Sequence, residues 1–217
     1  MVIEYNFKSI SENDFISIQN KLNQIDDTTY EIICINNFLT NKECNILIKE
    51  AQYHKVSPSQ IDSTIDTNYV TNHMRRSYTG YITDNNEISK KITNIVARLS
   101  GQPSENMEQL QIVRYEQGGF FVEHRDAGEV GQTSSRLYTF LIYLNNVEDG
   151  GETVFPKIDQ IIKPIKGSCV IFKSKNNNVI LDKSLHKANV VNVGFKCICT
   201  KWVHCCKLAN NMRGDLT

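Results

Sequence analysis

The chain has 217 residues, of which 40% are hydrophobic and 22% are charged, and its formal net charge at pH 7 is zero. A sequence of this length and apolar content can bury a hydrophobic core as one domain, which argues against an intrinsically disordered chain. With a pI near 6.9, the chain has no overall field that would attract a polyanion, so we predict no nucleic-acid partner.

Residues 1–6 lack the basic region and apolar run of a secretory signal. No segment approaches the roughly 18 consecutive apolar residues of a transmembrane helix. We therefore expect a soluble, cytoplasmic protein without a membrane partner.

Two helices are predicted in the first half of the chain. Thr40 and Glu43 have the spacing of a capping box, and apolar residues follow at helical intervals, so a helix is expected over about 41–54. Asp84 and Glu87 repeat the capping pattern before a second apolar stripe, which a glycine and a proline terminate. This stripe predicts a second helix packed on the core.

From residue 108 onward the pattern changes to short apolar runs separated by Gly-Gly, Asn-Asn and Pro-containing turns. The expected strands are 110–115, 120–125, 137–144, 169–172 and 190–203. Many short strands with turn signals predict a sandwich or a barrel. No internal repeat or linker divides the chain.

Seven cysteines stand at irregular positions, unlike the even framework of a small secreted domain. Reduced thiols are the simpler interpretation, and a zinc site is the alternative. The candidate zinc ligands are Cys197, Cys199, His204, Cys205 and Cys206. Alternation along a strand would place His204 on the face opposite to Cys197 and Cys199, which disfavours zinc.

The most informative feature is His124-Arg125-Asp126, followed later by His186. An imidazole and a carboxylate two residues apart on a strand point to the same face, and a distant imidazole can complete one side of an octahedral metal. Three protein ligands leave coordination positions open, which suits Fe(II) chemistry. The His-x-Asp pair alone is a weak signal, and the surrounding residues strengthen it.

A series of further motifs follows in order between Leu110 and His204. They read Gln111-x-Val113-Arg114-Tyr115-Glu116, His124-x-Asp126, Arg136-x-x-Thr139, Tyr143-Leu144-Asn145, Gly150-Gly151-Glu152-Thr153-x-Phe155-Pro156, Lys166-Gly167, Ser184-x-His186, Gly194-x-Lys196 and Trp202. With Arg75-Arg76-Ser77 and the segment 38–44 upstream, the series resembles the prolyl 4-hydroxylases, within the Fe(II)/2-oxoglutarate-dependent dioxygenases. The resemblance covers about residues 30–205.

The resemblance implies a mostly β fold with flanking helices (α+β), built on a double-stranded β-helix, or jelly roll, with an N-terminal helical layer. We expect one domain over residues 1–217. Its helical layer would span about 1–105, its jelly-roll core about 106–206 and a short C-terminal tail 207–217.

The resemblance also implies an oxidoreductase like procollagen-proline 4-dioxygenase, which hydroxylates peptidyl proline at C4. The reaction would use Fe(II), O2 and 2-oxoglutarate and yield succinate and CO2, and ascorbate (vitamin C) would rescue oxidised iron. His124, Asp126 and His186 are the expected metal ligands and catalytic residues.

The resemblance also implies which residues contact 2-oxoglutarate. Lys196 would hold the distal carboxylate, because an ammonium group inside an apolar barrel is costly unless an anion meets it. The alternative is a solvated strand lysine. Tyr115, Thr153, Trp202 and Tyr143 are expected around the co-substrate, with packed core side chains as the alternative.

Three residues are expected on the substrate side: Arg136, His204 and Arg76. A surface ion pair is the alternative for Arg136, and a satisfied strand histidine is the alternative for His204. His54 and His73 are expected on the surface or in loops. The segments 57–81 and 127–135 are expected to be loops that close over a peptide.

The expected partner is a proline-rich or collagen-like polypeptide, since such chains already hold the extended polyproline-II shape. The oligomeric state stays open. Animal collagen prolyl hydroxylases enter the secretory pathway, so the missing signal favours a cytosolic or virus-like setting, in the host cytoplasm if the chain is viral. Another 2-oxoglutarate oxygenase, acting on lysyl residues, nucleobases or small molecules, is the alternative function. A non-catalytic peptide-binding module is a third.

Overall fold

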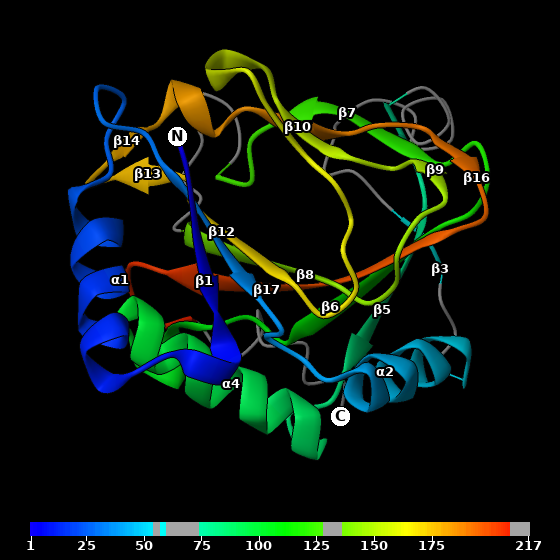
Figure 1. Cartoon of the computed structure of the whole chain (residues 1–217), viewed down its shortest axis with the longest axis horizontal. Coiled ribbons are helices and arrows are strands. Elements are labelled where there is room, and N and C mark those ends of the chain that lie inside the picture. Colours follow the sequence, from blue (N-terminus) through cyan, green and yellow to red (C-terminus); the bar gives the residue numbers. More distant parts are fainter. Residues whose placement is uncertain (54–56, 60–73, 128–135, 209–217) are drawn as a thin grey trace.

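The large sheet draws its strands from both halves of the chain (Figure 1). The computed structural model describes residues 1–53, 57–59, 74–127 and 136–208, without the side chains of 51–53. The strand order of the large sheet is β1-β2-β12-β8-β17-β6-β5-β3. Its strands span Val2–Asn6 (β1), Ile32–Asn36 (β2), Ser57–Pro58 (β3), Tyr78–Ile82 (β5), Leu110–Tyr115 (β6), Arg136–Tyr143 (β8), Cys169–Lys173 (β12) and Lys196–His204 (β17). β1 and β2 pair in parallel, and the other neighbours pair antiparallel.

A smaller sheet, in the order β11-β10-β15-β7-β4, faces the large one (Figure 1). Its strands span Arg75–Arg76 (β4), Phe120–His124 (β7), Thr153–Phe155 (β10), Gln160–Ile162 (β11) and His186–Ala188 (β15). Two short antiparallel pairs flank these sheets: Asp149–Gly150 (β9) with Val191–Val193 (β16), and Lys175–Asn176 (β13) with Val179–Ile180 (β14). The expected jelly roll is confirmed.

The predicted strands agree with the observed ones within a residue or two, with one division. Residues 190–203 form β16 and β17, separated by Gly194, whose φ of +83° only glycine adopts readily. Along β17, Lys196, Ile198, Thr200 and Trp202 line the cavity between the sheets, as the alternation predicted.

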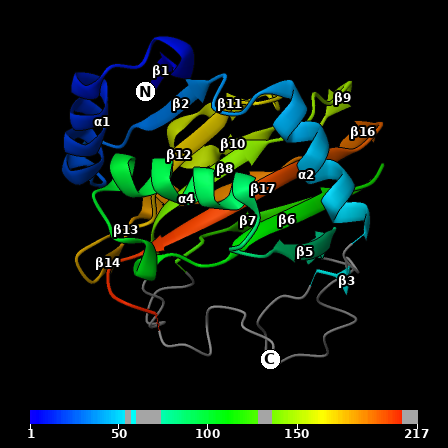
Figure 2. The same cartoon turned by 90° about the horizontal axis from the view of Figure 1, so that it is seen from below.

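Three helices cover the face of the large sheet that is turned away from the small sheet (Figure 2). They are α1 (Glu12–Gln24), α2 (Asn41–Tyr53) and α4 (Glu87–Ser100). The segment 1–105 is therefore not only helical, because it also contributes β1, β2, β3 and β5 to the large sheet and β4 to the small one. The strand β2 was not predicted because Ile32–Ile35 are all buried. A strand covered on both faces lacks the alternation of apolar and polar residues by which strands are recognised in a sequence.

Local signals explain where the helices begin. Ser11 and Asp14 form a reciprocal capping box at the start of α1, a helix that the sequence analysis did not predict. The N-cap of α4 is Asn86, whose side chain accepts from two backbone N–H groups, and not Asp84. α1 buries Phe15, Ile18 and Leu22, each worth roughly 1.5–3 kcal/mol of hydrophobic burial.

All seven cysteines are free thiols, five of them buried. Among the described residues, His124, Asp126 and His186 are the single group that could hold a metal, so the zinc alternative gains no support. None of the described helices is long and apolar enough to cross a membrane. His54, His73, most of the expected closing loops and residues 209–217 lie outside the described residues.

Candidate active site

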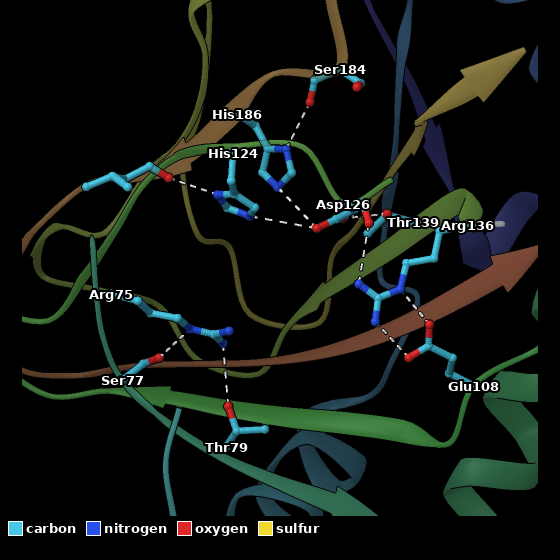
Figure 3. Close-up of polar contacts among 11 residues, drawn as sticks. Arg75, Ser77, Thr79, Glu108, His124, Asp126, Arg136, Thr139, Ser184 and His186 are labelled. Atoms are coloured by element: carbon cyan, nitrogen blue, oxygen red, sulfur yellow. Dashed lines mark hydrogen bonds and ion pairs between the residues drawn. The ribbon is translucent and has the colours of Figure 1, made fainter. Parts of the chain in front are cut away.

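The structure brings His124, Asp126 and His186 together between the two sheets (Figure 3). His124 ends β7 and His186 begins β15, and the two residues are direct partners in the antiparallel pairing. Asp126 lies in the turn after β7 and does not extend the strand. Its Oδ1 lies 3.7 Å from His124 Nε2 and 3.8 Å from His186 Nε2.

Hydrogen bonds to neighbouring groups orient these three side chains. His124 Nδ1 lies 2.8 Å from the carbonyl of Val122, and His186 Nδ1 lies 3.0 Å from the carbonyl of Ser184. Thr139 Oγ1 donates to Asp126 Oδ2 at 2.6 Å. Both imidazoles therefore turn Nε2 toward the free carboxylate oxygen, as ring orientation in metal sites requires.

The electrostatics of the site keep its donors in the form that binds a metal. Burial, reinforced by the neighbouring His186, lowers the pKa of His124 below its usual range, which favours the neutral imidazole. Burial alone would raise the pKa of Asp126, but His186, His124 and Arg136 outweigh it and hold that pKa low. Two imidazoles and a carboxylate on one side of a shared point fit Fe(II), because they leave the opposite side open.

Lys196 is 1% exposed and lines the same cavity. It is the cross-strand partner of Tyr115, and its Nζ lies 5.5 Å from the ring centroids of Tyr115 and Tyr143. Its hydrogen bond to Thr153 Oγ1 is long, at 3.5 Å. Burial lowers the pKa of Lys196 to about 7. No carboxylate among the described residues forms an ion pair with this buried ammonium. The negative charge of a ligand would therefore compensate it.

The other expected co-substrate residues surround Lys196. The Tyr143 hydroxyl donates to Thr153 Oγ1 at 2.7 Å, so Tyr143 also has the packed, hydrogen-bonded role that was its alternative. Trp202 lines the cavity, and its buried Nε1 has no hydrogen-bond partner among the described residues. A buried donor is rarely left unpaired, which again points to a ligand in the cavity.

Arg136 and His204 meet at a residue that the sequence analysis missed, Glu108. Figure 3 shows the Arg136 side of this contact. Arg136 binds both carboxylate oxygens of Glu108, at 2.5 and 2.9 Å, and His204 Nε2 lies 2.7 Å from Oε1. The Arg136 guanidinium also stacks 3.7 Å from the Trp202 ring. No local motif marks Glu108, because its partners come from β8 and β17.

Arg75, and not Arg76, is the arginine of its pair that lines the cavity, since Arg76 is exposed. Arg75 Nε donates to Ser77 Oγ at 2.8 Å (Figure 3). Its guanidinium lies 4.6 Å from the centroid of the Phe121 ring. Neighbouring residues of a strand face opposite sides of the sheet. In an Arg-Arg pair either residue could therefore face the cavity, and the strand register decides which one does.

Comparisons with known proteins agree with this geometry. A family model described as the 2OG-Fe(II) oxygenase superfamily matches residues 110–204. A protein of Acanthamoeba polyphaga mimivirus named "Putative prolyl 4-hydroxylase" is 30% identical over 208 residues, covering 91% of this chain and 82% of that protein. "Probable prolyl 4-hydroxylase 3" of Arabidopsis thaliana is 31% identical over 196 residues, covering 78% of this chain and 67% of its own length.

Solved structures share the fold. The viral collagen prolyl hydroxylase of Paramecium Bursaria Chlorella virus-1, in its 2OG complex, has a TM-score of 0.65 and 26% identity, covering 82% of this chain and 98% of that chain. A Trichoplax adhaerens prolyl hydroxylase in complex with a hypoxia inducible factor peptide has a TM-score of 0.68 at 18% identity, covering 89% of this chain and 90% of its own, a likeness of fold alone. The chain therefore belongs to the 2OG-Fe(II) oxygenase superfamily and, within it, to the prolyl 4-hydroxylases.

Proposed function

We propose that this protein is an oxidoreductase that hydroxylates peptidyl proline at C4, using Fe(II), O2 and 2-oxoglutarate and yielding succinate and CO2. The observation that carries the proposal is one cavity that holds the His124, Asp126 and His186 donors together with the buried ammonium of Lys196. Family membership adds to it, because the relatives named above are prolyl 4-hydroxylases.

In this proposal the chain's own residues hold and orient the reacting groups. When bound, Fe(II) supplies the dioxygen chemistry that is coupled to decarboxylation of the 2-oxo acid. Lys196 pairs with the distal carboxylate of 2-oxoglutarate, and the Thr153 and Tyr115 hydroxyls supply hydrogen bonds beside it. Trp202 and Tyr143 exclude water from this pocket.

The substrate would enter on the side of Arg136, His204 and the Arg75-Arg76 pair. Glu108 neutralises part of the charge of Arg136, whose planar guanidinium stacks on Trp202, and this pair would form part of the surface that the substrate meets. An extended proline-rich or collagen-like peptide suits such a surface, because polyproline II presents proline rings at low entropic cost. We propose this class as the substrate, ascorbate as the reductant and a cytoplasm as the location.

Succinate release against a panel of proline-rich and collagen-like peptides tests the function. Purified protein is supplied with Fe(II), 2-oxoglutarate and ascorbate, and the peptides are then analysed by mass spectrometry. The expected result is one added oxygen per modified proline, placed at C4, in proportion to succinate. His186→Ala serves as the matched inactive control, because it removes one donor.

Three outcomes contradict the proposal in different ways. Peptide-stimulated succinate without oxygen on proline would favour the alternative oxygenases, whose substrate would be lysyl, nucleobase or small-molecule. Peptide binding without succinate under any condition would favour the binding module. Equal succinate yield from wild type and His186→Ala would remove the metal-ligand assignment.

A further inference from the structure

β17 carries two buried lysines that face opposite sides of the large sheet. Lys196 is 1% exposed and faces the active-site cavity, whereas Lys201 is 2% exposed and faces α4. Their odd separation in the sequence places them on opposite faces of one strand. The active site gives the first lysine its role, but nothing in the proposed reaction uses the second.

Lys201 lies at the base of a cavity of about 480 Å³ between α4 and the short helix η2 (Ser104–Asn106). The ion-pair partner of its ammonium among the described residues is the exposed carboxylate of Asp84, 3.9 Å away, which is beyond hydrogen-bond distance. No hydrogen bond to Lys201 Nζ is present within the described part of the chain. A buried, incompletely paired ammonium costs free energy, and the cavity above it leaves space for an anion.

The cavity is polar, and its lining carries both signs of charge. Thr93 and Asn94 contribute from α4, Ser104 from η2, and Asp84 and Glu105 add carboxylates to the same lining. Lys90 adds a second ammonium, which already pairs with Glu87 at 2.9 Å. A second negative charge on a ligand would meet these two carboxylates at close range and be repelled. Hydroxyl or ammonium groups on the ligand would instead donate to them.

We infer that this cavity is a binding site for a small carboxylate that also carries hydrogen-bond donors, a hydroxy acid or an amino acid. Its carboxylate pairs with Lys201, and its hydroxyl or ammonium group donates to Asp84 and Glu105. The volume lies in the range of small-molecule sites, about 300–1,000 Å³. The inference uses residues on the helix side of the sheet and does not depend on the proposed reaction.

Thermal unfolding with L-serine and with D-glycerate tests the site, with equal concentrations of sodium chloride as the reference. A ligand at about one hundred times its Kd is expected to raise the Tm of wild type by several degrees, saturably. Lys201→Met should lose the response. Lys196→Met is the matched control, because it removes the lysine on the other face of the same strand and should keep the response.

A direct measurement on the unmodified protein covers the case in which Lys201→Met does not fold. Acylation of Lys201 by an amine reagent, followed by mass spectrometry, should slow at least fivefold in the presence of the responding ligand. The exposed Lys163 should react at an unchanged rate. The inference is overturned if neither serine nor glycerate alters the Tm or the Lys201 acylation rate, or if Lys201→Met responds like wild type.

Discussion

Lys196 and Trp202 each carry a polar atom without a short hydrogen bond inside the active-site cavity. The ammonium of Lys196 has a 3.5 Å contact to Thr153, and Trp202 Nε1 has no partner among the described residues. The sequence identified Lys196 as a candidate through its position after His186. Its burial in the cavity without an ion pair to a described carboxylate is a property of the fold. This isolation makes the lysine sensitive to pH.

The affinity for 2-oxoglutarate is expected to fall as the pH rises above about 7. Burial lowers the pKa of Lys196 to about 7, so its ammonium form is present below that pH and is lost above it. Because only the ammonium attracts a carboxylate, KM for 2-oxoglutarate should stay flat from about pH 6 to 7 and then rise up to about tenfold per pH unit. Steady-state succinate assays across this range measure the effect.

Lys196→Arg is the control for this pH dependence, because a guanidinium stays protonated throughout. Its KM for 2-oxoglutarate should not change with pH in the same range, even if its value is higher. A wild-type KM that is constant up to about pH 8.5 would count against the pairing of Lys196 with the co-substrate.

Thr139→Val is expected to weaken metal binding about 10- to 100-fold, because it removes a partner that orients a ligand. Thr139 donates to Asp126 Oδ2 at 2.6 Å, and valine keeps the shape but not the hydroxyl. Thr200→Val is the matched control, since Thr200 lines the same cavity from β17 without a hydrogen bond to Asp126. Calorimetric titration with Mn(II) measures both, and equal Kd values for the two variants would contradict the role of Thr139.

At the scale of elements, the N-terminal segment supports the loop that precedes His186, one of the proposed metal ligands. Asp27 accepts hydrogen bonds from the backbone N–H groups of Asp182 and Lys183, at 3.2 and 3.0 Å. These residues begin the short helix η4 (Asp182–Ser184). The carbonyl oxygen of Ser184, at the end of this helix, lies 3.0 Å from His186 Nδ1. A residue that precedes β2 therefore helps to fix a histidine on β15.

Asp27→Ala is expected to lower the free energy of unfolding by about 1–3 kcal/mol, because two backbone donors lose a charged acceptor. Asp27→Asn, which keeps one acceptor oxygen, should lose less. Urea unfolding monitored by circular dichroism measures both changes. An unchanged urea midpoint in Asp27→Ala would show that water replaces the carboxylate without cost.

At the scale of the whole molecule, five of the seven thiols lie in the core and none is in a disulfide. Burial raises the pKa of Cys34 to about 12 and that of Cys44 to about 11, so these thiols are unreactive near neutral pH. Cys205 and Cys206 are exposed after the end of β17. The fold thus separates the cysteines into two classes that composition alone does not distinguish.

A chromogenic disulfide reagent is expected to titrate two thiols quickly in the native protein and all seven after denaturation. A reductant should leave the Tm unchanged, because no cross-link constrains the unfolded chain. Rapid reaction of more than two thiols in native protein would indicate that the core around β2, β12 and β17 opens readily.

The sequence by itself determined a strand-rich sandwich or barrel, the strands β6, β7, β8, β12, β16 and β17, and the helices α2 and α4. Through the resemblance to the prolyl 4-hydroxylases it also indicated the jelly-roll topology and the grouping of His124, Asp126 and His186. The strands and helices follow from short-range periodicity, whereas the topology and the ligand grouping follow from the order of the family's motifs along the chain. Tertiary structure decided that β1 and β2 join the large sheet, that Arg75 faces the cavity instead of Arg76, and that Glu108 joins Arg136 to His204. Each depends on strand register or on contacts between distant segments, and a shift of one residue reverses which face a side chain occupies.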